Sequence, residues 1–228
     1  MAVITKKDLE EAVAVSALIL KALQGTLAGQ TGLAGAKTNF LCGQLLAYNS
    51  AELVAGGTKF WLDFQNCFEA AQQSGASFQA MGNVLATANA LTPVGIWATA
   101  VKNFSIRMSL LEQARILAAT NFTSRQQIDE YFDAIDASFQ AAELTAADNL
   151  DNVAYTALIN VHAMVSNDLS TRSFSLPTIV TYSFPARIPA LLLAQRLYQD
   201  ASRTQELIGE NSAINPLFMP SSGQALAS

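Results

Sequence analysis

Two long segments place apolar side chains at helical spacing, and this feature restricts the possible folds more than any other. Between residues 128 and 142, and again between 150 and 165, apolar residues recur every three or four positions. Such spacing gathers them on one face of an α-helix. The two sets are Ile128, Tyr131, Phe132, Ile135, Phe139 and Ala142, and Leu150, Val153, Ala154, Ala157, Val161, Met164 and Val165. The short link between the sets predicts an antiparallel helical hairpin.

Helix-start signals and small residues support the same fold class. Pairs that fit the capping box, a polar residue followed three positions later by an acid or amide, precede several predicted helices. The pairs are Thr5 with Asp8, Thr123 with Gln126, and Thr145 with Asp148. The chain also contains 39 alanines, which favour helix and allow helices to approach closely. The sequence therefore predicts an all-α protein, an Ala-rich helical bundle.

One short extended segment, near residues 177–184, interrupts this pattern. The residues preceding Pro177, Pro185 and Pro189 are each disfavoured in the helical region. Residues 178–182 between the first two prolines are β-branched or aromatic, a composition typical of strands. Two interpretations are open. The segment pairs with the edge of another subunit, or it crosses the bundle as an extended connection.

The segments differ enough to predict three regions. Residues 1–35 form an N-terminal helix and a Gly-rich connection, and residues 36–210 form the helical bundle domain. Residues 211–228 are rich in Pro and Ser, so they cannot continue a helix and are expected to form an extended C-terminal tail.

Charge is sparse, which bears on the expected partners. Only 14% of the residues are charged, against about 25% in an ordinary soluble domain, so much of the surface is expected to be covered by other subunits. Residues 70–101 carry no charge, but they include polar residues throughout, so no membrane span is expected. The net charge is −5 and the basic residues are scattered, so direct nucleic-acid binding is not expected.

No set of residues predicts a reaction, a cofactor or a metal. The stretch GLAGAKT lacks the Gly that a phosphate-binding loop needs directly before its Lys, because Ala36 stands there. His162 is the sole histidine and is expected to be buried or at an interface. Cys42 and Cys67 are expected to be buried thiols, and a disulfide between them stays open.

Three aspartates share one face of the first predicted hairpin helix. Asp129, Asp133 and Asp136 are spaced at i, i+4 and i+7, opposite the aromatic residues. A solvated acidic face is the default interpretation, and a docking surface for a basic partner is the functional alternative.

The C-terminal third has a distinctive order of residues. It runs Leu176-Pro177, Pro185, Arg187, Pro189-Ala190-Leu191, Ala194, Arg196-Leu197-Tyr198, Asp200-Ala201, Arg203, Glu206, Asn211, Asn215-Pro216, Phe218, Pro220 and Gly223. This order resembles the C-terminal region of the DNA-circularisation protein family of Mu-like contractile-tailed phages, whose members are tail or baseplate components. The resemblance covers about 50 residues. It implies a structural role at the baseplate hub or tail-tube end, with location in the virion after synthesis in the bacterial cytoplasm. The alternatives are a non-virion helical adaptor or tail-assembly chaperone, and an enzyme or small-ligand carrier.

Assembly requires contact residues, and the extended segment and the tail supply candidates. The expected interface residues are Thr178, Val180, Tyr182, Ile214, Leu217, Phe218 and Met219. The resemblance implies other tail or baseplate proteins as partners and a homo-oligomer of three-fold or six-fold symmetry. On this hypothesis the tail binds neighbours and does not stabilise its own bundle, so truncation after Asn211 is expected to leave the melting temperature unchanged.

Overall fold

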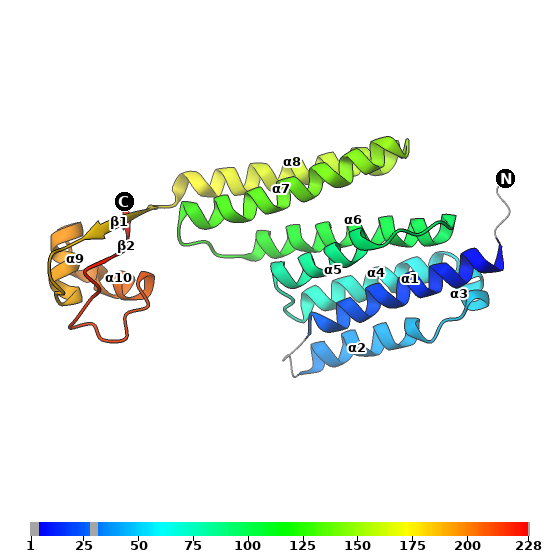
Figure 1. The fold of residues 1–228 in the computed structure, drawn as a ribbon, viewed down its shortest axis with the longest axis horizontal. Helices are drawn as coiled ribbons and strands as arrows, with labels where there is room; N and C mark the ends of the chain where they lie inside the picture. The colour runs from blue at the N-terminus through cyan, green and yellow to red at the C-terminus, as the bar shows by residue number, and fades with distance from the viewer. Residues whose placement is uncertain (1–4, 28–31, 228) are drawn as a thin grey trace. The chain divides into compact units, whose positions relative to one another are not determined.

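α-Helices dominate the computed structural model, which describes residues 5–27 and 32–227 (Figure 1). Ten α-helices, one short 3₁₀ helix and two β-strands lie within these residues. They are α1 (Lys6–Gly25), α2 (Leu33–Leu46), α3 (Ser50–Gly56), α4 (Thr58–Gln73), α5 (Phe78–Ala90), α6 (Ile96–Ala119), α7 (Arg125–Asp148), α8 (Asn152–Ser175), β1 (Thr178–Ser183), α9 (Ala190–Tyr198), η1 (Ala201–Arg203), α10 (Thr204–Glu210) and β2 (Ser222–Ala227). The predicted all-α fold class is confirmed.

The chain divides into two compact units. The N-terminal unit comprises Met1–Thr120 and Ala134–Val165, and the C-terminal unit comprises Asn121–Asp133 and Ser166–Ser228. α7 and α8 therefore contribute residues to both units. This division differs from the three predicted regions. The first helix belongs with the helices that follow it, and residues 211–228 share a unit with the residues before them.

Aromatic side chains at a spacing of four form part of the N-terminal unit's core. Phe60, Phe64 and Phe68 lie along α4 and are buried. The ring centroids of Phe60 and Phe64 are 5.6 Å apart, as are those of Phe64 and Phe68. Cys67 on α4 and Cys42 on α2 are buried free thiols, as predicted. The spacing along one helix thus becomes a continuous apolar seam.

A long-range cap holds the start of α6. The backbone N–H groups of Val94 and Gly95 donate to Oε1 and Oε2 of Glu11, at 2.9 and 2.7 Å. Glu11 belongs to α1, so a carboxylate from one helix binds the amide groups before the first turn of another. This contact satisfies donors that lie beyond the internal hydrogen bonds of α6 and places negative charge at the positive end of its dipole.

The predicted caps give mixed results. The Thr5–Asp8 capping box is confirmed, with Asp8 N–H donating to Thr5 Oγ1 at 3.2 Å. The Thr145–Asp148 cap is wrong, because Thr145 Oγ1 donates to the Ala141 carbonyl oxygen at 2.9 Å within a continuous α7. The hairpin instead turns at residues 149–151, and the Asp151 carboxylate accepts from the backbone of α8.

The Thr123–Gln126 capping box is also wrong. At the start of α7, the Gln127 N–H donates to Ser124 Oγ at 3.4 Å, and the Gln127 side-chain oxygen accepts from the Thr123 N–H at 2.9 Å. Gln126 is therefore free to make a different contact, with β1.

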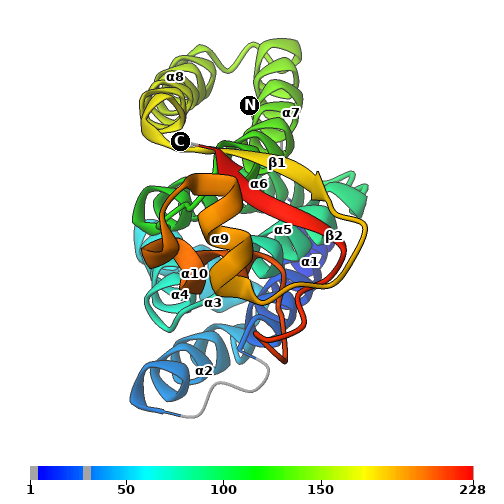
Figure 2. The ribbon, with the colours of Figure 1, turned by 90° about the vertical axis from the view of Figure 1, so that its left-hand side faces the viewer.

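The extended segment forms a strand, and a partner for it lies in its own chain, which neither interpretation of the sequence included. β1 pairs with β2 of its own chain in a two-stranded antiparallel sheet, with Thr178 opposite Ala227 and Ser183 opposite Ser222. Figure 2 shows the strands side by side as yellow and red arrows. The last described residues are thus not a free tail, because they supply the partner strand for β1.

Candidate interaction surface in the C-terminal unit

The C-terminal unit builds its own small core on one face of the two-stranded sheet. Both strands, α9, α10 and the segment before β2 each contribute buried side chains. The buried members are Tyr182, Ala190, Leu193, Ala194, Leu207, Met219 and Ala225. A two-stranded sheet alone is marginally stable, so these helices stabilise it by covering one of its faces.

Two of the seven predicted interface residues belong to this core. Tyr182 is 6% exposed and Met219 is fully buried, so neither side chain is presented to a neighbour. Burial also raises the pKa of the Tyr182 hydroxyl. Thr178 is half-buried, and Val180 is 44% exposed. The assignment of Tyr182 and Met219 to an interface is therefore corrected, because both are used inside the chain.

The segment between α10 and β2 is fixed at two points. The Met219 N–H donates to the Ile188 carbonyl oxygen at 3.1 Å, and the Ala190 N–H donates to the Pro216 carbonyl oxygen at 2.7 Å. The side chain of Met219 is also buried. The segment is therefore anchored to the start of α9.

Three large apolar side chains at and just before these anchors are exposed to solvent, Leu217 and Phe218 between the anchors and Ile214 before them. Ile214 is 101% exposed, Leu217 63% and Phe218 61%. Asn215 sets their backbone, because its Oδ1 accepts from the Leu217 N–H at 3.0 Å and its carbonyl oxygen accepts from the Phe218 N–H at 3.1 Å. We call Ile214, Leu217 and Phe218 the apolar loop. An anchored loop that exposes three such residues is typical of a contact surface.

Side chains close the outer edge of β2. Asn211 accepts from the Gln224 N–H at 2.8 Å and donates to the Gln224 carbonyl oxygen at 2.7 Å, as a neighbouring strand would. Two residues further, the Tyr198 hydroxyl accepts from the Leu226 N–H at 3.1 Å, and Arg203 donates to the Leu226 carbonyl oxygen at 3.0 Å. The outward backbone groups of both residues are satisfied.

Gln126 of α7 makes the equivalent contact on β1. Its Oε1 accepts from the Ile179 N–H at 2.8 Å and its Nε2 donates to the Ile179 carbonyl oxygen at 3.1 Å. No pattern in the sequence indicates this pairing, since Gln126 and Ile179 lie on different elements 53 positions apart.

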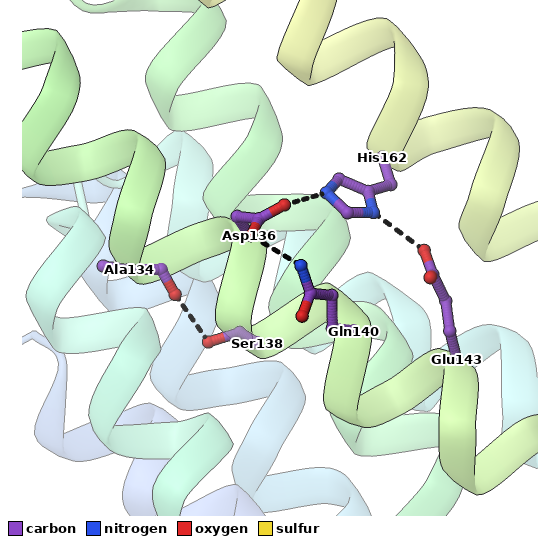
Figure 3. Close-up of polar contacts among 6 residues, drawn as sticks. All are labelled: Ala134, Asp136, Ser138, Gln140, Glu143 and His162. Atoms are coloured by element: carbon purple, nitrogen blue, oxygen red, sulfur yellow. Dashed lines mark hydrogen bonds and ion pairs between the residues drawn. The ribbon is translucent and has the colours of Figure 1, made fainter.

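A polar cluster in the N-terminal unit contains the histidine (Figure 3). His162 of α8 lies between two carboxylates of α7, with Nδ1 2.9 Å from Glu143 Oε1 and Nε2 2.9 Å from Asp136 Oδ1. Its ring stacks on Phe139, with centroids 5.0 Å apart. Each ring nitrogen lies within hydrogen-bond distance of one carboxylate oxygen. Both nitrogens are occupied, and the arrangement clamps the two helices.

Asp136 thus has a role that the spacing of the three aspartates did not indicate. Asp129 and Asp133 are exposed, whereas Asp136 is half-buried and also accepts from Gln140 Nε2 at 2.7 Å. The signal that could have found the contact is the recurrence of acids at 136 and 143, two turns apart, facing the next helix of a hairpin.

An ion pair joins α6 to the turn of the hairpin. Arg107 Nη2 lies 2.6 Å from Asp151 Oδ2, while Asp151 Oδ1 accepts from the Ala154 N–H at 3.1 Å. The hydrogen bond from Ala154 and then that from Arg107 lower the pKa of Asp151 below its usual range. Asp151 is therefore both the cap of α8 and a contact to α6.

Neither a group of metal-binding side chains nor a membrane-spanning helix is found among the described residues. Within residues 5–27 and 32–227, no three His, Cys, Asp or Glu side chains are grouped so that they could hold a metal ion. Among the helices of this same part of the chain, none combines the length and apolar character needed to cross a membrane.

The geometry defines a helical protein with an exposed apolar loop. No protein-family model matches the sequence, and the curated proteins contain no significant match to it.

Proposed function

We propose that this protein is a structural component of a phage contractile tail, at the baseplate hub or tail-tube end, and that it acts by assembling with other proteins. The observation that carries the proposal of assembly is the apolar loop, which exposes Ile214, Leu217 and Phe218 on an anchored backbone. The resemblance of the C-terminal third to tail proteins supports the setting. The proposed partners are further copies in a ring of three-fold or six-fold symmetry, and other tail or baseplate proteins.

The energetics favour use of the apolar loop as a contact. Burying one large apolar side chain is worth roughly 1.5–3 kcal/mol. Three such side chains contribute roughly 4.5–9 kcal/mol, which offsets a large part of the cost of association. The backbone of Leu217 and Phe218 is already fixed by Met219 and Asn215, so these two residues need little ordering on binding. The overall shortage of charge, 14% of residues, fits a surface that is covered in the assembled state.

The test compares two sets of serine substitutions in assembling phage. The first variant replaces Ile214, Leu217 and Phe218 by Ser, and the control replaces Val94, which is 91% exposed in the N-terminal unit. We expect both variants to keep the wild-type melting temperature, because the replaced side chains lie in solvent. Only the first is expected to be absent from purified tails.

Two outcomes would redirect the proposal. If the wild-type protein is required for tail formation but absent from purified particles, the assembly-chaperone alternative replaces a structural role. If the loop variant enters tails as the wild type does, the apolar loop is not the contact. Direct DNA binding forms no part of the proposal, because the net charge is −5.

A further inference from the structure

At the outer edge of β1, some backbone N–H and C=O groups have no hydrogen-bond partner in the part of the chain that the structure describes. In an antiparallel pair, residues alternate between those bonded across the pair and those whose backbone groups point outward. The Phe184 N–H donates to the Ser221 carbonyl oxygen at 2.6 Å, so the even-numbered residues of β1 face β2. Ile179, Thr181 and Ser183 therefore direct their N–H and C=O groups away from β2.

These three residues differ in whether the outward groups are satisfied. Ile179 is bonded on both groups by Gln126. For Thr181 and Ser183, no hydrogen bond to the outward N–H or C=O exists among the described residues, and both residues are exposed. On the opposite side of the sheet, β2 is closed at Gln224 and Leu226. On β1 the open edge is thus the three-residue stretch 181–183, while on β2 the exposed Ser222 also has no hydrogen bond to its outward groups within residues 5–27 and 32–227.

We propose that the open edge of β1 pairs with the same edge of a second copy of this chain, antiparallel across a two-fold axis at Tyr182. This register places Thr181 opposite Ser183 of the other copy, and Ser183 opposite Thr181. All four outward N–H and C=O groups in each copy's stretch then find partners. The result is a four-stranded sheet with the order β2-β1-β1-β2.

The ends of the stretch match this pairing. One step beyond, Ile179 lies opposite Pro185 of the other copy. Ile179 has no free group, because Gln126 holds both, and Pro185 has no N–H to donate. A longer strand from an unrelated protein therefore gains no ladder bond at Ile179 and at most one at Pro185, through its carbonyl oxygen, whereas the edge is complementary to itself.

The composition of the edge also permits self-pairing. Natural proteins commonly protect exposed edges with charged side chains, especially Lys. Residues 176–186 contain no charged residue. A two-stranded sheet gains stability from added strands, which favours pairing over an open edge. The contact is short, so we expect a weak dimer of the kind formed by small interfaces. It uses residues separate from the apolar loop, and it does not depend on the proposed role in a tail.

The experiment measures association of the full chain by sedimentation at concentrations up to about 1 mM. To separate the two surfaces, all proteins carry the three serine substitutions in the apolar loop. Two variants share Thr181→Lys and differ only at position 183, where one carries Ser183→Lys and the other Ser183→Glu. In the proposed register, the first places Lys opposite Lys twice and the second places Lys opposite Glu twice. We expect the Lys/Lys variant to associate roughly tenfold more weakly and the Lys/Glu variant at least as strongly as the parent.

A cross-linking assay tests the register without relying on charge. Chains with Thr181→Cys and chains with Ser183→Cys are mixed and treated with a short thiol cross-linker, while Cys42 and Cys67 stay buried. We expect cross-linked dimers in the mixture and few in either sample alone. A parent that is monomeric at the highest concentration would overturn the proposal. So would equal association of the two charge variants, or equal cross-linking in mixed and separate samples.

Discussion

Gly223 lies directly opposite Tyr182 in the two-stranded sheet, and the tyrosine occupies the space that a side chain at 223 would need. A Cβ atom there would lie 2.7 Å from the Tyr182 hydroxyl oxygen and 2.9 Å from its Cζ. It would also clash with Oδ1 of Asn211, which accepts a hydrogen bond from the backbone N–H of Gln224. The glycine therefore allows an aromatic side chain of the core and a side-chain cap of the strand to meet at one place.

Replacing Gly223 by Ala is expected to destabilise the C-terminal unit by about 1–3 kcal/mol, the usual cost of an overpacked core. Chemical denaturation and amide exchange of β1 and β2 measure the loss. The control is Gly209→Ala in α10, where an added Cβ meets nothing within 4 Å. That change is expected to be neutral or stabilising by up to about 1 kcal/mol, because Ala favours helix over Gly. Equal effects of the two substitutions would contradict the packing described for Gly223.

Truncation after Asn211 is expected to unfold the C-terminal unit. The deletion removes the buried Met219 and β2, which is the strand that pairs with Tyr182. This outcome is the reverse of the one that the sequence alone predicted, since the tail belongs to the core. Amide exchange should show lost protection in residues 176–210, with protection retained in α1, α4 and α6. Full protection of α9 and β1 after truncation would refute it.

His162→Ala is expected to destabilise the N-terminal unit by about 1–3 kcal/mol, because Glu143 and Asp136 are half-buried and would lose their shared partner. Thermal or denaturant unfolding of the full chain checks the size of the effect. Met164→Ala on the same helix is the control, since Met164 is 64% exposed and its loss should change little. If both variants have the same free energy of unfolding, the contacts of His162 with Glu143 and Asp136 do not contribute to stability.

Asp151→Asn should reveal a pH-dependent contribution. The pKa of Asp151 is lowered in the folded chain, so ionised Asp151 favours folding. Its contribution is present above the unfolded pKa of about 3.9 and is lost as the pH falls through the folded value. We therefore expect wild type to be more stable than Asp151→Asn at pH 7, with the difference shrinking below about pH 4. A difference in unfolding free energy that stays constant down to pH 2 would exclude the ion pair as its source.

The helices could be predicted from the sequence because periodicity is a local property. Ile128, Ile135 and Phe139 are all buried, as their spacing on one face indicates. The second predicted face was wrong in large part, because Leu150, Val153 and Met164 are exposed. The position of the hairpin turn could not be read in the same way. Thr145 bonds within its own helix, which a mid-helix Thr does as readily as it caps one.

β1 could be predicted and β2 could not, for a physical reason. The residues of β2 are mostly small or polar, with low strand propensity, so nothing local indicates extended structure. Its conformation depends on contacts distant in sequence: Tyr182 over Gly223, Asn211 on Gln224, and the caps on Leu226. Met219 was assigned to an interface for the same reason, because an apolar residue in a polar segment has the same local pattern whether it is buried or exposed.

The Glu11 cap has a consequence for the order of folding. Glu11 and the amide groups that it binds are 83 and 84 positions apart in the sequence. A chain emerging from the ribosome can form α1 early, but α1 cannot supply this cap until Val94 and Gly95 have been synthesised. Closing so large a loop is slow compared with helix formation. The start of α6 should therefore gain protection late, together with the docking of α1.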